Sequence, residues 1–169
     1  MRLPVSPKPD EILEAAMRSE ILAAAVYSKL NRKVRNILLK EKLKFLILEE
    51  KKHKKTLEKL FRQRFGRRKP ELPCAPAIPL PSPPIGETSP VMDLFKFALE
   101  KEKAAEEFYL QVAKNFEDSG SRSILEYLSR VERSHYYMIQ SEIDLLEKFP
   151  DYYSVEDFHV GEDLFHVGP

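Results

Sequence analysis

The chain has 169 residues, of which 43% are hydrophobic and 33% charged, and it carries a net charge of +1 at pH 7. This composition is typical of a globular protein, and the balanced charge gives no reason to expect nucleic acid or an anionic membrane as the main partner. Cys74 is the single cysteine, which excludes an internal disulfide and a CxxC metal site. Because the sequence has no apolar signal region or membrane-length apolar run, it predicts a cytoplasmic protein.

Apolar residues recur at helical spacing in four segments, and the first two predict an antiparallel pair. The first helix is expected over about residues 8–30. The second is expected over about residues 37–65, where Gly66 ends it, because glycine readily takes the backbone conformation found after a helix. The short stretch between the two helices predicts a turn, so that residues 8–65 form hairpin one.

The next segment, residues 66–90, holds most of the chain's 13 prolines. Proline fixes φ and removes a backbone donor, so a segment this rich in proline forms neither a helix nor a central strand. We expect an extended crossover linker that is long enough to run along the whole domain.

Two more helices are expected after the linker, over about residues 90–116 and 122–149. The sequence "EDSG" at 117–120 predicts the turn between them. Residues 91–149 therefore form hairpin two. A polar and aromatic C-terminal tail, residues 150–169, follows.

The two hairpins are copies of one pattern. When the second half of the sequence is aligned with the first, "AMRSEILAAAVY" lies over "ALEKEKAAEEFY", so that Glu20 matches Glu102 and Tyr27 matches Tyr109. The sequence thus predicts an all-α four-helix bundle, a single domain over residues 1–169. Two repeated antiparallel helical hairpins form it, and the long proline-rich crossover joins them.

Polar residues interrupt the apolar stripe of the second and fourth helices at matching positions. The second helix carries Glu50 and His53 in "EKKH", and the fourth carries Glu132 and His135 in "ERSH". The i, i+3 spacing puts both side chains of each pair on one helical face. A single Glu-x-x-His is more often an accident of a helix rich in Glu and Lys than a metal motif, but here it occurs twice, in register with the repeat.

The spacing within each hairpin also brings a lone glutamate to the level of the Glu-x-x-His. The interval from Glu20 to Glu50 equals the interval from Glu102 to Glu132, and the expected turn lies midway in each case. Stacking the hairpins thus places four carboxylates and two imidazoles at one level of the core. Buried charges without compensation destabilise a bundle, whereas two divalent cations would balance four carboxylates.

A lone glutamate on each of two helices and a Glu-x-x-His on each of the other two is the ligand set of di-iron and di-manganese carboxylate bundles. On these residues the sequence resembles the rubrerythrin-like branch of the ferritin-like superfamily, over about residues 8–149. The resemblance implies a ferritin-like bundle that holds two iron ions, in a site that manganese or zinc can also occupy in vitro. The implied metal ligands are Glu20, Glu50, His53, Glu102, Glu132 and His135.

The family pattern also implies how these ligands are shared and what the site does. It has two bridging residues, Glu50 and Glu132, and two pairs that each complete one metal, Glu20 with His53 and Glu102 with His135. The implied activity is that of a non-haem di-iron oxidoreductase that reacts with dioxygen or hydrogen peroxide, of ferroxidase or peroxidase type, in oxidative stress or iron handling. The alternative is a metal-binding or oligomerising helical module without catalytic turnover.

Two departures from the family pattern bear on chemistry and partners. Rubrerythrins carry a C-terminal rubredoxin domain with four cysteines, whereas this chain has Cys74 alone, which implies a separate electron-donor protein. Rubrerythrins also carry an extra glutamate one turn after the lone glutamate of the third helix, where this chain has Ala105. A homodimer is expected from the habit of the family.

Several polar residues near the motif have open roles. Tyr27 and Tyr109 lie two turns beyond the lone glutamates, and each is expected either to pack in the core with a buried hydroxyl or to hydrogen-bond a ligand carboxylate. Glu49 is expected in solvent, and Glu106 is expected at the rim or on the surface of the bundle. Glu142 falls near the inward stripe of the fourth helix, and the sequence offers no explanation for it.

Overall fold

The computed structural model describes residues 8–66, 69–74 and 90–150. Within these ranges the chain forms no strand and four α-helices, which are α1 (Pro9–Lys33), α2 (Ile37–Phe65), α3 (Val91–Ala113) and α4 (Ser119–Lys148). The predicted all-α fold with four helices is confirmed. Most of the expected crossover and the expected tail, with His159 and His166, lie outside the described residues.

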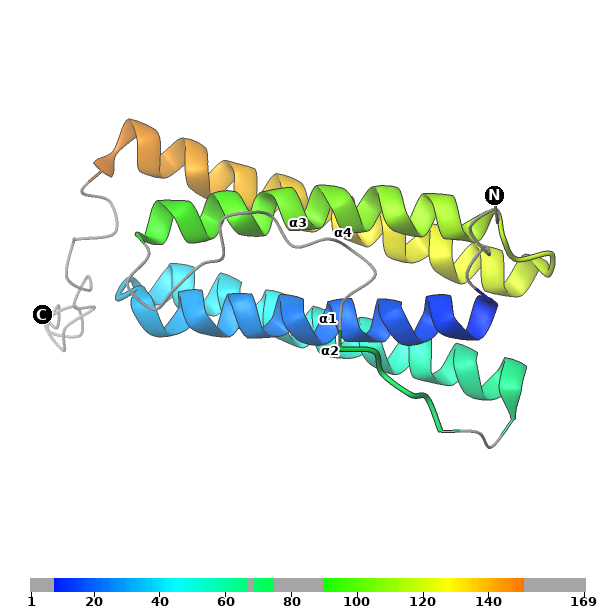
Figure 1. Ribbon diagram of the computed structural model, residues 1–169. Helices are drawn as coiled ribbons and strands as arrows, with labels where there is room; N and C mark the ends of the chain where they lie inside the picture. The colour runs from blue at the N-terminus through cyan, green and yellow to red at the C-terminus, as the bar shows by residue number, and fades with distance from the viewer. Residues whose placement is uncertain (1–7, 67–68, 75–89, 151–169) are drawn as a thin grey trace, which may run out of the picture.

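The four helices run along one axis as two hairpins, α1 with α2 and α3 with α4 (Figure 1). Between the hairpins, α1 packs against α3 and α2 packs against α4. Helix α2 ends at one end of the bundle and α3 begins at the opposite end. These positions of the two helix ends agree with the predicted bundle topology, in which a long crossover joins the two hairpins.

Local signals fix both ends of α2. Asn36 precedes the helix, and its side-chain oxygen accepts the backbone N–H of Leu39 at 3.1 Å, which satisfies one of the free donors of the first turn. Gly66 follows the helix with a backbone φ of 70°, a conformation that residues other than glycine rarely adopt. The predicted end of this helix is confirmed. Helix α1 extends to Lys33, beyond its predicted end.

The turn between α3 and α4 differs from the prediction. Helix α3 ends at Ala113 rather than at Phe116, and α4 begins at Ser119, inside the predicted turn 117–120. The reason is Asp118, whose carboxylate accepts a backbone N–H in the first turn of α4 at 2.7 Å and so caps the helix earlier. Phe116 is fully buried although it lies outside the helix.

The apolar core is divided into two clusters along the bundle axis. The cluster nearer the start of α1 includes Leu13, Met17, Leu57, Phe61, Tyr109, Phe116, Leu125 and Leu128. The cluster nearer the end of α1 includes Tyr27, Leu30, Leu43, Leu46, Leu94, Phe95, Ile139 and Ile143. Burial of these side chains drives the packing of the four helices. The two clusters leave a level between them that buried polar side chains fill.

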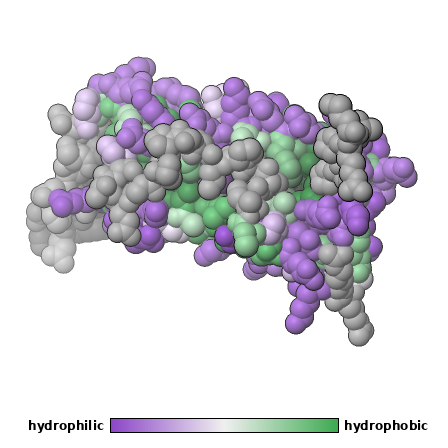
Figure 2. Space-filling view, in the orientation of Figure 1, coloured by the Kyte–Doolittle hydropathy of each residue, from purple (hydrophilic) through white to green (hydrophobic). Residues whose placement is uncertain are grey.

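The surface of the bundle is mixed. Figure 2 shows hydrophilic side chains along the edges of the molecule and apolar ones in the middle of the face that α1 and α3 form. Among the described residues, no helix combines the length and the hydropathy needed to cross a membrane.

Candidate metal centre

Six acidic and imidazole side chains fill the level between the two apolar clusters, and none is more than 3% exposed. They are Glu20 on α1, Glu50 and His53 on α2, Glu102 on α3, and Glu132 and His135 on α4. Each helix thus contributes one carboxylate, and α2 and α4 each add an imidazole on the same face, one turn further on. The structure brings together all six residues that the sequence singled out.

These side chains form two overlapping groups, each able to surround one ion. One group is Glu20, Glu50, His53 and Glu132, and the other is Glu50, Glu102, Glu132 and His135. Within each group, one oxygen or nitrogen atom per residue lies within 4.8 Å of the others. Glu50 and Glu132 belong to both groups, which is the position required of residues that bridge two metal ions.

Each imidazole faces carboxylates from several helices. His53 Nδ1 lies 2.9 Å from Glu132 Oε1 and 3.4 Å from both Glu20 Oε2 and Glu50 Oε2. His135 Nδ1 lies 3.3 Å from Glu50 Oε1 and 3.5 Å from Glu132 Oε2. The two rings are stacked, with centroids 5.5 Å apart and planes at 16°. The arrangement therefore has the same approximate twofold relation as the sequence repeat.

Two buried tyrosines hold the lone glutamates, and each does so from the other hairpin. The Tyr27 hydroxyl of α1 donates a hydrogen bond to Glu102 Oε1 of α3, and the Tyr109 hydroxyl of α3 donates one to Glu20 Oε1 of α1. Both rings are also packed in the apolar clusters. The two roles that the sequence leaves open for these tyrosines, core packing and hydrogen bonding to a carboxylate, are thus both present.

Burial and crowding shift the pKa values of the carboxylates. Burial first, and then the neighbouring Glu50, raises the pKa of Glu20 to about 8. Burial first, and then the charges of Glu102 and Glu20, raises the pKa of Glu132 to about 7. Burial alone would also raise the pKa of Glu102, but interactions with His135 and Glu132 outweigh it and lower that pKa to about 2. The carboxylates therefore differ in protonation at neutral pH.

The imidazoles are protonated in the metal-free cluster. Burial alone would lower the pKa of both rings, because it disfavours the charged form. The surrounding carboxylates outweigh burial, so the pKa of His135 rises to about 12 and that of His53 rises well above its usual range. At pH 7 both rings and the Glu20 carboxyl thus hold protons.

Many of the polar atoms in this cluster make no well-directed hydrogen bond among the described residues, although both Nδ1 atoms lie within ion-pair distance of carboxylates. These seven buried atoms are both ring nitrogens of His53 and of His135, Oε1 of Glu50 and of Glu132, and Oε2 of Glu102. A buried polar atom left without a hydrogen bond costs about 1–3 kcal/mol, so a ligand that engages these atoms would stabilise the cluster. Carboxylate oxygens and imidazole nitrogens are suitable donors for iron, manganese and zinc. The residues present therefore fit a pair of such ions.

Glu49 is a further acidic residue that approaches the cluster. It is half-buried rather than fully in solvent as expected, and with His53 and His135 it forms a third group that can surround an ion. Its Oε1, however, lies 2.5 Å from Lys52 Nζ in an ion pair at the surface. The two overlapping groups, with four fully buried residues each, are therefore the stronger candidates for metal sites.

The roles of two lysines were not anticipated. Lys101, next to Glu102 in the sequence, is only 4% exposed, and its charge contributes to the lowered pKa of Glu102. Lys42 of α2 forms an ion pair with Glu142 of α4, which explains why a glutamate faces inward there. No pattern in the sequence points to either lysine. In the repeat Lys101 aligns with Ser19 and Lys42 aligns with Ile124, so neither position is shared by the two hairpins.

Metal loading is expected to release protons. At pH 7 the Glu20 carboxyl and both imidazoles must lose their protons to become ligands, and Glu132, with a pKa of about 7, is about half protonated. Loading with Zn²⁺ should therefore release about three to four protons per chain. Because fewer protons are displaced at higher pH, the affinity should rise as the pH increases toward 8, the approximate pKa of Glu20. A titration in weakly buffered solution with a pH indicator measures both effects.

The Glu20→Gln variant provides the control for this titration. It lacks one of the titrating carboxyls and should release about one proton fewer at pH 7. Binding of Zn²⁺ without proton release, or with an affinity that does not change with pH, would contradict the assigned protonation states.

Comparison with known proteins places the chain in a family. A search of the curated proteins found no match. A solved structure, described as a hypothetical protein from Pyrococcus furiosus, is similar to the chain at 33% sequence identity with a TM-score of 0.75, over 83% of this chain and 90% of that one. The sequence model of the family Rubrerythrin matches residues 11–143. With its ferritin-like bundle of four helices, the chain belongs to the rubrerythrin family.

Proposed function

We propose that the protein is a non-haem di-iron oxidoreductase that reacts with dioxygen or hydrogen peroxide. One observation carries the proposal: two four-residue groups of buried ligand atoms overlap in Glu50 and Glu132. A single-metal or purely structural cluster has no need of two groups that share residues. The proposed ligands are Glu20 and His53 for one iron, Glu102 and His135 for the other, and Glu50 and Glu132 as bridges.

The charges of the cluster favour a pair of divalent ions. Four ionised carboxylates and two neutral imidazoles carry a charge of −4, which two divalent cations balance. The mixture of hard oxygen ligands and imidazole suits iron in particular, and manganese or zinc can bind in its place. Because such ions are interchangeable in this ligand set, the identity of the working metal is part of the proposal.

A bound iron pair supplies two electrons, as the two-electron reduction of hydrogen peroxide to two water molecules, with two protons, requires. The chain's own contribution is to fix the ligands and keep bulk water out. Burial first, and then the nearby carboxylates, raises the pKa of Tyr27 and of Tyr109, so both hydroxyls stay protonated. The Tyr27 and Tyr109 hydroxyls can thus keep donating hydrogen bonds to Glu102 and Glu20, which fixes the orientation of these two carboxylates during the reaction. The electrons are returned by a separate electron-donor protein.

Metal analysis of protein purified from iron-supplemented cells tests the proposal. We expect about two irons per chain, a ferric absorption that bleaches on reduction, and oxidation of the reduced protein by dioxygen or peroxide faster than Fe²⁺ in buffer. Glu107→Ala, at an exposed position on α3 outside the cluster, is the matched control and should behave as the wild type. Two irons that react no faster than free Fe²⁺ would instead indicate a passive metal-binding module.

A further inference from the structure

A pocket between α1 and α2 leads from the surface to the cluster. It has a volume of about 250 Å³, and Glu20 and Glu50 are among its lining residues. These two carboxylates are 3% and 1% exposed, whereas Ala25 and Lys51, which line the same pocket, are exposed. The pocket thus connects solvent with one carboxylate of each helix of hairpin one. Small side chains on α1, including Ala24 and Ala25, keep it open.

The sequence repeat shows what stands at the equivalent place in hairpin two. In the alignment that matches Glu20 with Glu102, Ala24 corresponds to Glu106 and Lys51 corresponds to Arg133. Glu106 Oε1 lies 2.5 Å from Arg133 Nη2 and 2.6 Å from Arg133 Nε. An ion pair therefore joins α3 to α4 at the two positions that are equivalent, by the repeat, to Ala24 and Lys51 in the lining of the α1/α2 pocket. In addition, Leu110 replaces Ser28.

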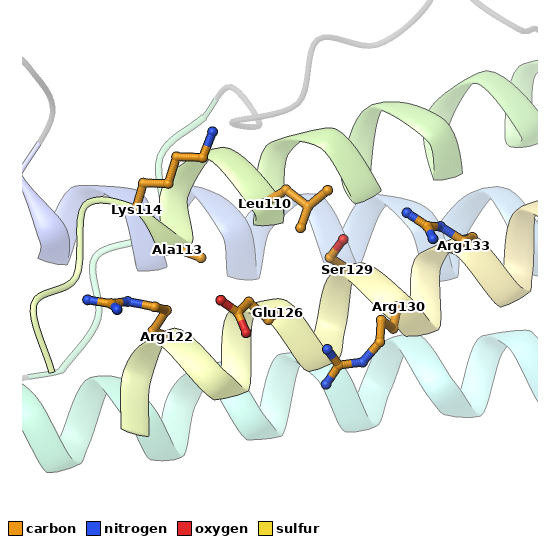
Figure 3. Close-up of a pocket in the computed structure, with 8 residues that line it drawn as sticks. All are labelled: Leu110, Ala113, Lys114, Arg122, Glu126, Ser129, Arg130 and Arg133. Carbon is orange, nitrogen blue, oxygen red and sulfur yellow. The ribbon is translucent and has the colours of Figure 1, made fainter. Parts of the chain in front are cut away.

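A pocket does lie between α3 and α4, but its lining includes neither Glu102 nor Glu132. It has a volume of about 520 Å³. Figure 3 shows Leu110 of α3 and Arg133 of α4 among its walls, with Ser129 between them. Although this pocket is twice as large as the one in hairpin one, it gives no contact with the carboxylates of its own hairpin.

We infer that the α1/α2 pocket is the route by which a small uncharged oxidant reaches the cluster, and that the Glu106–Arg133 ion pair closes the equivalent route in hairpin two. The inference rests on the proposed function for the identity of the oxidant. Lys51 and Lys54 line the pocket, and although Lys54 pairs with Glu58 at 2.6 Å, the exposed Lys51 places a positive charge at the mouth, which disfavours the entry of hydrated cations. Uncharged molecules of the size of dioxygen or hydrogen peroxide meet no such barrier.

The route can be tested in the metal-free protein with two cysteine variants. In a Cys74→Ala background, Glu50→Cys and Glu132→Cys place a single thiol at positions that are both 1% exposed. The uncharged reagent methyl methanethiosulfonate is expected to modify the thiol at position 50 about tenfold faster or more, because only that position lines the α1/α2 pocket. Global unfolding would expose both thiols and cannot produce this difference.

A blocking substitution separates access from intrinsic thiol reactivity. Adding Ala24→Leu should slow modification at position 50 by about tenfold and leave modification at position 132 unchanged. Equal rates at the two positions, or a slowing that Ala24→Leu causes at both, would overturn the inference. Circular dichroism and thermal unfolding confirm that each variant is folded. Since no iron is involved, this result stands or falls independently of the proposed oxidoreductase activity.

The Ala24→Leu substitution also tests the route in the iron-loaded protein. If two irons bind, Ala24→Leu should slow the association of nitric oxide, an uncharged diatomic probe, with the reduced protein, at unchanged iron content. The Glu106→Ala variant, which removes the ion pair of hairpin two, should bind the probe at least as fast as the wild type. Slower binding in Glu106→Ala together with a normal rate in Ala24→Leu would place the route in hairpin two instead.

Discussion

Glu132→Ala and Glu50→Ala are each expected to abolish the binding of two metal ions. Both residues belong to both ligand groups, so that removing either one takes a ligand from each ion. Glu20 and Glu102 belong to one group each. Titration with Zn²⁺, followed by metal analysis after gel filtration, should give about two ions per wild-type chain and at most one in the Glu132→Ala and Glu50→Ala variants.

The matched control is Glu102→Ala, which removes an equally buried carboxylate from only one group. We expect this variant to keep the ion held by Glu20, Glu50, His53 and Glu132. If Glu132→Ala retained two tightly bound ions, or if Glu102→Ala lost both, the bridging assignment would be wrong.

These bridging variants are expected to fold without metal at least as well as the wild type. At pH 7 the Glu20 carboxyl is protonated, so the other three carboxylates, when ionised, and the two protonated imidazoles sum to −1, and removing one of those carboxylates brings the sum to 0. Less charge repulsion then remains in the core, where burial already disfavours the charged form. Thermal unfolding of the metal-free proteins, followed by circular dichroism, measures this. A severe loss of stability would show that the cluster holds the bundle together even without metal.

Metal loading is expected to raise the thermal stability of the wild-type protein. The unfolded chain cannot assemble residues that lie on four helices, so the metal binds the folded state preferentially. At a free metal concentration of one hundred times Kd, one site contributes about 2.7 kcal/mol. For a chain of this length that corresponds to a rise in Tm of about 5–10 °C. Differential scanning calorimetry with and without Zn²⁺ measures the shift.

The same measurement on Glu132→Ala distinguishes specific from non-specific binding. Its Tm should rise less than that of the wild type at the same Zn²⁺ concentration, because fewer ligands remain. An identical rise in both proteins would mean that the metal binds elsewhere, and an absence of any rise in the wild type would contradict a metal site in the folded state.

The sequence is sufficient to predict the helices and the convergence of the six polar side chains. Helical periodicity locates α1 to α4, and the internal repeat with its equal spacing brings Glu20 level with Glu50. The sequence does not predict where α3 ends and α4 begins, because the start of α4 depends on the side chain of Asp118, which caps that helix. Repeats and periods describe positions along the chain, whereas a cap depends on the orientation of one side chain.

Contacts between the hairpins also cannot be predicted from the repeat. The sequence places Tyr27 two turns after Glu20 on the same helix, but its hydroxyl bonds to Glu102 on the neighbouring hairpin. The partner depends on how far α1 and α3 are shifted along each other, which the internal alignment of the chain does not fix. The ion pair of Lys42 with Glu142 follows from the same kind of packing between α2 and α4.

The crossed hydrogen bonds mean that neither hairpin is complete by itself. A hairpin alone has a tyrosine without its acceptor and a glutamate without its donor, and a second copy, turned by half a rotation, would supply both. The chain thus corresponds to a symmetric pair of hairpins fused into one polypeptide. Fusion lets one half change without the other, and Glu106 with Arg133, opposite Ala24 with Lys51, is a place where the halves have diverged.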